Sequence, residues 1–225
     1  MTPTPSSRNA AELPEPRESQ EVRTIFWDLG GVLLTNGWDL HQRARVLSSL
    51  GVDLQAYEAV HDSANYFWER GLASAEDFFR ETVIHSNPQL KITFAELWTL
   101  VCAESQVLHP ECFDLLSALG ASGRYRLATL NNESRELNAH RLDAFDLRRH
   151  FSYFLCSGYL HEMKPAPGFY RYAIEISGLP PSSSLFIDDK PENCVAARAL
   201  GMQTILFQSP AQLTRELATL GIQTA

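Results

Sequence analysis

The stretch Thr24-Ile25-Phe26-Trp27-Asp28-Leu29-Gly30-Gly31 decides the fold of this chain. Its first four residues are β-branched or aromatic and too few for a helix, which predicts a short buried strand. Asp28 then stands at the carboxyl end of that strand. In an open α/β sheet, ligands bind in the crevice beyond the carboxyl ends of the strands. We therefore interpret Asp28 as a site residue, although taken alone it has the simpler interpretation of a turn or helix cap.

Downstream of residue 119, strand patterns alternate with helix patterns. Strands are expected at Arg126–Leu130, Tyr153–Cys156, Ser184–Ile187 and Gln203–Phe207, and helices at residues 134–142, 167–177 and 191–200. This alternation predicts a parallel sheet with helices on both faces. The fold class is therefore α/β, with a doubly wound, Rossmann-like parallel-sheet core.

The segment between the first strand and the others lacks a convincing strand. Helices are expected at residues 43–50, 55–70, 75–84 and 94–103, where Ser74 and Thr93 provide N-caps followed by early acidic residues. We expect an inserted helical cap at residues 38–105 and a core domain formed by residues 22–37 and 106–225. Residues 1–21 are rich in Pro, Ser, Thr and Glu, which predicts a disordered leader.

Composition narrows the class of partner. The chain has 225 residues, 44% of them hydrophobic, which suffices for one domain with an insertion. A net charge of −8 argues against binding to nucleic acid or an anionic membrane. The four cysteines are scattered, which indicates free thiols and neither a zinc site nor a disulfide framework. Without an apolar span or a secretion signal, we expect a cytoplasmic protein, monomeric or homodimeric, with a small-molecule partner.

Four short segments carry the chemistry, and each places a charged or polar group after an apolar run or in a loop. They are Trp27-Asp28-Leu29-Gly30-Gly31-Val32-Leu33, Leu130-Asn131-Asn132, Lys164-Pro165 and Phe186-Ile187-Asp188-Asp189. In this order they resemble the four motifs of the haloacid dehalogenase superfamily, over about residues 24–207. A helical cap after the first motif, with Glu69-Arg70-Gly71 inside it, is similar to the branch that includes sugar-1-phosphate phosphatases.

The resemblance implies transfer of a phosphoryl group, which needs an in-line nucleophile and positive charge around the phosphate oxygens. Asp28 would attack phosphorus and form an aspartyl-phosphate that water opens. Lys164 would neutralise the transferring oxygens, and Asn131 would donate a side-chain N–H to one of them. The backbone amides of Leu29 and Asn132 would complete the cradle.

The resemblance also implies a magnesium site. Asp28, the Gly30 carbonyl and Asp189 would bind Mg²⁺ directly, while Asp188 would hold a metal-bound water or a neighbouring lysine. Gly30 is also expected to contact the phosphate. The cap would select the substrate, which is expected to be a sugar phosphate, and Arg70 is a candidate phosphate contact. The other cap candidates are Trp38, His41, Arg43, Tyr66, Trp68 and Glu69.

Two positions depart from the pattern. Phosphatases of this superfamily usually carry a second Asp where this chain has Gly30, and Ser or Thr is the usual residue where it has Asn131. General acid–base help contributes about 10²–10⁴-fold, so its loss is compatible with a slower phosphatase. His161 or Glu162 is a candidate replacement for the missing acid. One alternative is a catalytically weak member that binds a phosphorylated ligand or a partner, and a second is a hydrolase of the 2-haloacid dehalogenase type.

Overall fold

The structure, a computed structural model, describes residues 21–223. Five parallel strands form one sheet in the order β3-β2-β1-β4-β5. Their bounds are Thr24–Trp27 for β1, Arg126–Asn131 for β2, Tyr153–Cys156 for β3, Ser184–Asp188 for β4 and Gln203–Leu206 for β5. The expected α/β fold with a parallel sheet is confirmed. The leader expected at residues 1–21 lies outside the described residues, apart from Glu21.

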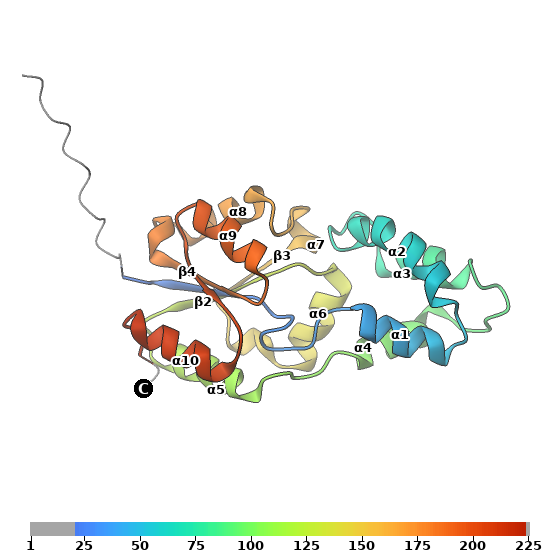
Figure 1. Ribbon diagram of the computed structural model, residues 1–225, viewed down its shortest axis with the longest axis horizontal. Coiled ribbons are helices and arrows are strands. Elements are labelled where there is room, and N and C mark those ends of the chain that lie inside the picture. The colour runs from blue at the N-terminus through green and yellow to red at the C-terminus, as the bar shows by residue number, and fades with distance from the viewer. Residues whose placement is uncertain (1–20, 224–225) are drawn as a thin grey trace, which may run out of the picture.

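Helices cover both faces of this sheet (Figure 1). On one face, Ile25 and Trp27 of β1 share a hydrophobic cluster with α5, α6 and α10, whose bounds are Pro110–Ala121, Arg135–Ala144 and Pro210–Thr219. On the other face, Phe26 packs in a cluster with α8 (Pro167–Ser177) and α9 (Pro191–Ala199). Because side chains alternate across a strand, a central strand covered on both faces is buried at every position, as β1 is.

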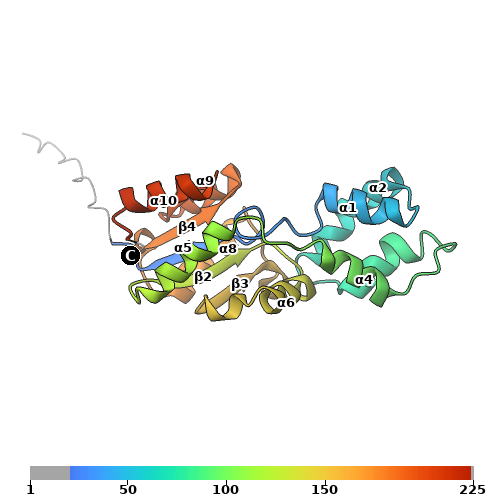
Figure 2. The same cartoon turned by 90° about the horizontal axis from the view of Figure 1, so that it is seen from below.

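A second group of helices lies beyond the carboxyl ends of the strands (Figures 1 and 2). It consists of α1 (Leu40–Ser49), α2 (Leu54–Trp68), α3 (Ala75–Phe79), the π-helical η1 (Arg80–Ile84) and α4 (Phe94–Ala103). These helices have their own hydrophobic cluster, which includes Trp68, Phe79 and Leu97 and reaches Leu137 of α6. We name this group the helical cap; the domain boundaries expected at residues 38 and 105 stay a prediction.

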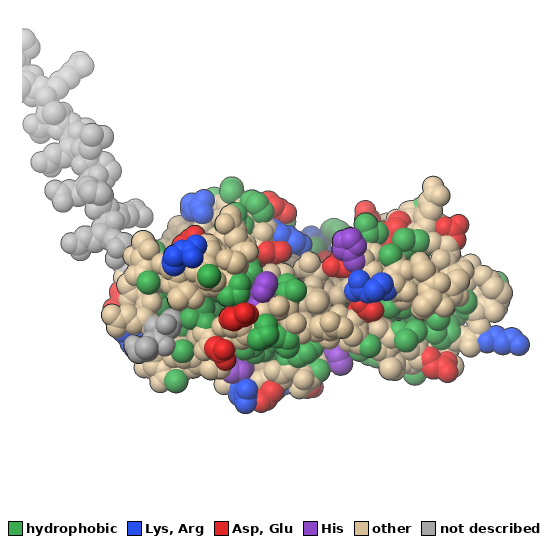
Figure 3. Space-filling view, turned by 60° about the horizontal axis from the view of Figure 1, so that its bottom comes forward, with side chains coloured by type: hydrophobic (Ala, Val, Ile, Leu, Met, Phe, Trp, Pro, Cys, Tyr) green, Lys and Arg blue, Asp and Glu red, His purple; other side chains and the backbone are tan. Residues whose placement is uncertain are grey.

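The remaining elements are single turns, namely α7 (Ser157–Leu160), η2 (Leu147–Arg149) and η3 (Pro181–Ser183). Within residues 21–223, no helix is both long and apolar enough to cross a bilayer. On the face shown in Figure 3, acidic and basic side chains are interspersed, and no continuous basic patch covers that face.

Candidate active site

The predicted polar residues meet at the carboxyl edge of the sheet. Asp28 follows β1, Asp188 ends β4 and Lys164 lies in the loop before α8. The Lys164 Nζ is 2.9 Å from Asp28 Oδ2 and 2.7 Å from Asp188 Oδ2. Carboxylate oxygens of Asp28, Asp188 and Asp189 all lie within 4.8 Å of one another. Parallel strands end at the same edge, which is why segments up to 160 positions apart converge here.

Burial and mutual repulsion govern the charges of this cluster. Burial raises the pKa of Asp28 to about 7; Lys164 opposes this rise, and Asp188 and Asp189 add to it. Burial, followed by repulsion from Asp188, also raises the pKa of Asp189. Burial alone would lower the pKa of Lys164, but the attraction of Asp28 and Asp188 outweighs it and leaves that pKa above its ordinary value. Three carboxyl groups thus share one ammonium, and a further cation would relieve the repulsion among them.

Asp188 and Asp189 differ in whether their carboxylate oxygens already have hydrogen-bond partners. Asp188 accepts hydrogen bonds from the Lys164 ammonium, from the backbone N–H of Lys190 at 2.8 Å and from the Asn193 side chain at 2.9 Å. Asp189 has a buried Oδ1 without any hydrogen-bond partner. An unpartnered carboxylate oxygen beside two other carboxylates is the donor type that Mg²⁺ prefers. The residues present therefore fit a magnesium ion.

Gly31 allows the turn after β1 to close against Asp189. Its φ of +74° is unfavourable for residues with a side chain, and a Cβ atom there would lie 2.6 Å from the Asp189 Cγ. The turn also brings the Leu29 backbone N–H within 2.8 Å of Asp28 Oδ1, to which it donates. In this arrangement the Leu29 amide orients the Asp28 carboxylate.

Asn132 holds the loop that carries Lys164. Its side-chain amide donates to the Lys164 carbonyl at 2.9 Å, and its Oδ1 accepts from the Lys164 backbone N–H at 2.8 Å. Both main-chain groups of Lys164 are thereby satisfied by one side chain. Because Lys164 is only 4% exposed, this anchoring fixes the direction in which its ammonium points.

The Asn131 side chain already makes hydrogen bonds within the protein. Its amide donates to Asn138 Oδ1 at 3.1 Å and makes a longer contact of 3.5 Å to Glu133 Oε2. Its own Oδ1 is buried without a partner. A carboxylate can only accept hydrogen bonds, so Glu133 favours the orientation in which the Asn131 N–H groups point toward it. The Asn131 Oδ1 is then the amide atom left without a partner. The expected donation from Asn131 to a phosphate therefore competes with two contacts already made.

A cavity of about 410 Å³ opens beside Asp28 and is lined by both the strand ends and the helical cap. Of the cap candidates, Trp38, Arg43 and Glu69 line it, whereas His41, Tyr66, Trp68 and Arg70 do not. The Arg70 guanidinium lies over the Tyr66 ring, 4.0 Å from its centroid. Its expected contact with a phosphate therefore has no support in this geometry.

The two proposed replacements for the missing acid also lie outside the cavity lining. The His161 Nδ1 is 2.6 Å from the Arg70 carbonyl oxygen, and the His161 side chain is exposed. Glu162 packs beside α8, where a Cβ atom on Gly168 would lie 3.1 Å from its Cδ. Neither side chain is placed to protonate a ligand next to Asp28.

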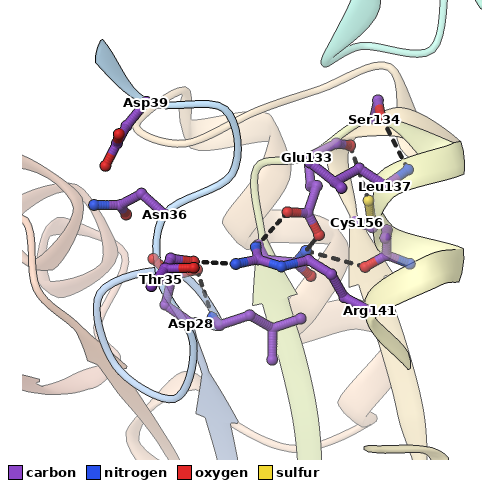
Figure 4. A network of polar contacts seen from close by, with 12 residues as sticks. Asp28, Thr35, Asn36, Asp39, Glu133, Ser134, Leu137, Arg141 and Cys156 are labelled. Atoms are coloured by element: carbon purple, nitrogen blue, oxygen red, sulfur yellow. Dashed lines mark hydrogen bonds and ion pairs between the residues drawn. The ribbon is translucent and has the colours of Figure 1, made fainter. Parts of the chain in front are cut away.

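Sequence reasoning missed a buried ion pair in the cavity wall. Arg141 Nη1 lies 2.5 Å from Glu133 Oε1, with side chains 1% and 4% exposed. Figure 4 shows the guanidinium between Glu133 and Thr35, whose carbonyl oxygen accepts from Nη2. Burial raises the pKa of Glu133, and the Arg141 charge opposes that rise. Glu133 precedes Ser134, the N-cap of α6, and Arg141 lies in the last turn of that helix, so no helical spacing in the sequence pointed to this pair.

The C-terminal end of α2 rests on the core next to this wall. The Ser157 hydroxyl donates to the Glu69 carbonyl at 2.7 Å and accepts from the Glu133 backbone N–H at 2.8 Å. Gly71 passes so close to α7 that a Cβ atom there would lie 2.9 Å from the Gly158 carbonyl carbon. Glu69 is thus fixed relative to the strand ends as well as to the helical cap.

Comparison with known proteins agrees with this architecture. A profile of the haloacid dehalogenase-like hydrolases matches residues 22–201. The chain is 27% identical over 191 residues to a phosphoglycolate phosphatase from Pseudomonas fluorescens, covering 83% of this chain and 69% of that relative. The chain therefore belongs to the haloacid dehalogenase-like hydrolases, as the four motifs predicted.

Two solved structures share the fold. A predicted HAD-like family hydrolase from Porphyromonas gingivalis superposes with a TM-score of 0.70 at 23% identity, over 90% of this chain and 98% of that one. A HAD family enzyme from Bacteroides thetaiotaomicron, in complex with magnesium and inorganic phosphate, superposes with a TM-score of 0.66 at 18% identity, over 84% and 95%. In that fold the carboxyl edge of the sheet is the place for a ligand.

Proposed function

We propose that this hydrolase is a magnesium-dependent phosphatase that acts on a small phosphorylated metabolite through Asp28. The observation that carries the proposal is the cluster of Asp28, Lys164, Asp188 and Asp189 at the cavity. It combines a nucleophile, a cation and an unpartnered metal-binding oxygen within one site. The printed names of the relative in Pseudomonas fluorescens and of the magnesium and phosphate complex support the same reaction class.

The proposed reaction has two displacements. An oxygen of Asp28 attacks phosphorus, the bond to the leaving alcohol breaks, and water then opens the aspartyl-phosphate to give phosphate. Lys164, already 2.9 Å from Asp28, remains charged and faces the transferring oxygens. Magnesium supplies charge neutralisation when bound, and Asp28, Asp189 and the Gly30 carbonyl would hold it. Asp188 keeps Lys164 in place through its 2.7 Å contact.

The cavity favours a sugar phosphate over a substrate with a second anionic group. Of its four cationic side chains, Arg43 is bound to Glu58, Arg141 to Glu133 and Lys164 to the aspartates. Of these four, only the Lys190 side chain forms no ion pair within residues 21–223. The rest of the wall presents carboxylate and amide oxygens, which accept hydrogen bonds from hydroxyl groups. A polyhydroxylated substrate matches this wall better than phosphoglycolate does.

The test is phosphate release from sugar phosphates, phosphoglycolate and nucleotides, with and without Mg²⁺, for wild type and Asp28→Asn. We expect magnesium-dependent turnover of at least one sugar phosphate, lost in the variant because an amide is a poor nucleophile. Faster turnover of phosphoglycolate than of every sugar phosphate would contradict the substrate class. Equal turnover by the wild type with and without Mg²⁺ would contradict the metal assignment.

A second candidate is a weak member that binds phosphorylated ligands without turning them over. Gly30 and the internal hydrogen bonds of Asn131 are the observations in its favour. It predicts that Mg²⁺ and phosphate bind to a protein that releases no phosphate from any substrate. A beryllium fluoride complex, which mimics the aspartyl-phosphate, would then form without any measurable turnover. Halide release from 2-halo acids without added metal would instead indicate a dehalogenase.

A further inference from the structure

The turn after β1 has no acidic side chain at position 30, although an alcohol leaving group needs a proton. A Cβ atom on Gly30 would lie 3.0 Å from the Asn36 Oδ1. The space that a longer side chain at position 30 would enter is therefore already taken by an amide. An amide has no proton to give at neutral pH. The proton donor for the proposed phosphatase reaction has to come from elsewhere in the cavity.

Four carboxyl groups besides Asp28 line the cavity, and three of them have other tasks or positions. Asp39 is the N-cap of α1, where it accepts from a backbone N–H. Glu133 is committed to the buried ion pair with Arg141. Glu192 is exposed at the first turn of α9. Glu69 is left, and among residues 21–223 it has no ion-pair partner.

We propose that Glu69 is the general acid and base of this site, acting from the helical cap in the place of an aspartate at position 30. The inference rests on the proposed phosphatase function. Glu69 follows the last turn of α2, lines the cavity and is anchored to the core through its carbonyl by Ser157. Glu69 thus borders the cavity from the cap side, where we place the leaving group of a substrate bound to Asp28.

The surroundings of Glu69 shift the titration of its carboxyl group toward neutral pH. Burial raises the pKa of Glu69 to about 7. A hydrogen bond from Asn65 and the positive charges of Lys190 and Lys164 oppose this rise, whereas the Glu133 charge adds to it. A general acid works best when its pKa lies near the operating pH, because both protonation states are then populated.

Glu69 accounts for both proton transfers of the proposed reaction. In the first displacement, Asp28 forms a bond to phosphorus, the bond from phosphorus to the leaving oxygen breaks, and that oxygen takes the proton of Glu69. In the second, the Glu69 carboxylate takes a proton from water while the water oxygen bonds to phosphorus and the bond to Asp28 breaks. Phosphate leaves, and both side chains return to their starting states.

The experiment compares Glu69→Gln with wild type on an alkyl sugar phosphate and on p-nitrophenyl phosphate, whose leaving group needs no proton. We expect kcat/KM for the sugar phosphate to fall by about 10²–10⁴-fold, and that for p-nitrophenyl phosphate to change far less. The wild-type kcat/KM for the sugar phosphate should fall above about pH 7, as Glu69 loses its proton, and the variant should lack this decline. Glu76→Gln, an exposed glutamate of α3, is the matched control and should behave as wild type.

Several outcomes would overturn the proposal. Equal losses on both substrates would show that Glu69 supports the structure of the site without donating a proton. Unchanged turnover of the sugar phosphate by Glu69→Gln, or a selective loss in Glu162→Gln instead, would assign the acid elsewhere. Failure of the phosphatase function is distinguishable, because wild type itself would then release no phosphate. An unchanged unfolding midpoint of Glu69→Gln in urea excludes a folding defect as the cause.

Discussion

Arg141 and Glu133 are charged residues that the fold removes almost completely from water beside the cavity. Their 2.5 Å contact compensates the two charges, and Thr35 accepts a further hydrogen bond from Arg141. Removal of one partner from a buried pair leaves an uncompensated charge and costs about 3–5 kcal/mol. We expect Arg141→Met to lower the free energy of unfolding by this amount at pH 7, measured by urea denaturation.

Two further variants separate charge from packing. The double variant Arg141→Met with Glu133→Gln should recover much of the loss, because no charge is left unpaired. Arg148→Met breaks an ion pair to Asp143 whose side chains are 54% and 68% exposed, and should change stability by only about 0–1 kcal/mol. Without Arg141, the pKa of buried Glu133 rises further, so the deficit should shrink as pH falls. A deficit that is independent of pH would contradict this account.

At the scale of an element, the turn after β1 depends on glycine for two separable reasons. Gly31 has a φ of +74°, and its missing Cβ atom leaves room for Asp189. Gly51 has nearly the same φ, +73°, with nothing near its missing Cβ atom. We expect Gly51→Ala to cost about 1–2 kcal/mol from backbone strain alone, and Gly31→Ala to cost more. Urea denaturation of both variants measures the difference.

The same pair of variants reports on the metal site. In Gly31→Ala the new methyl group displaces the Asp189 carboxylate, so Mg²⁺ binding measured by calorimetry should weaken. Gly51→Ala should bind Mg²⁺ as wild type does, since Gly51 lies at the end of α1 in the helical cap. Equal magnesium affinities in the two variants would show that the Asp189 carboxylate can move aside without loss of Mg²⁺ binding. Close packing of the turn against Asp189 would then not be needed for the metal site.

Elements with strong local signals could be predicted from the sequence, and the rest could not. The helix Phe94–Ala103 was predicted to the residue because Thr93 and Glu96 form a capping box. Pro167–Ser177 was likewise predicted, between Pro167 and the left-handed Gly178. α5 was not predicted, and its N-cap, His109, makes no side-chain hydrogen bond to the helix. The single turn α7 has no periodicity to detect.

The candidate site, too, could be predicted from the sequence only in part. Asp28 and Asp188 were predicted to meet because each follows an apolar strand of one parallel sheet. The roles assigned to them stay predictions. The pair of Glu133 and Arg141 depends on how α6 leans over the strand ends, and the place of Glu69 depends on how the helical cap rests on Ser157. Contacts between elements of this kind have no signature within either segment.

At the scale of the whole molecule, the carboxylate cluster costs stability that a divalent cation should restore. The raised pKa of Asp28, about 7, means that its ionised form is disfavoured in the metal-free fold. Stability of the metal-free protein is therefore lost through this group as pH rises from about 4 to about 7. Magnesium binds the ionised carboxylates, so its stabilising effect should grow over the same pH range.

Thermal unfolding with and without Mg²⁺ at constant ionic strength measures this effect. At a magnesium concentration 100 times its Kd, the added stability is about 2.7 kcal/mol, which for a chain of this size raises Tm by roughly 5–11 °C. Asp189→Asn should lose most of that rise, because the unpartnered Oδ1 belongs to this side chain. The exposed carboxylate of Asp62 offers a matched control in Asp62→Asn, which should keep the full rise. An equal increase in Tm for all three proteins would place the bound magnesium away from the cluster and remove the physical basis for the site.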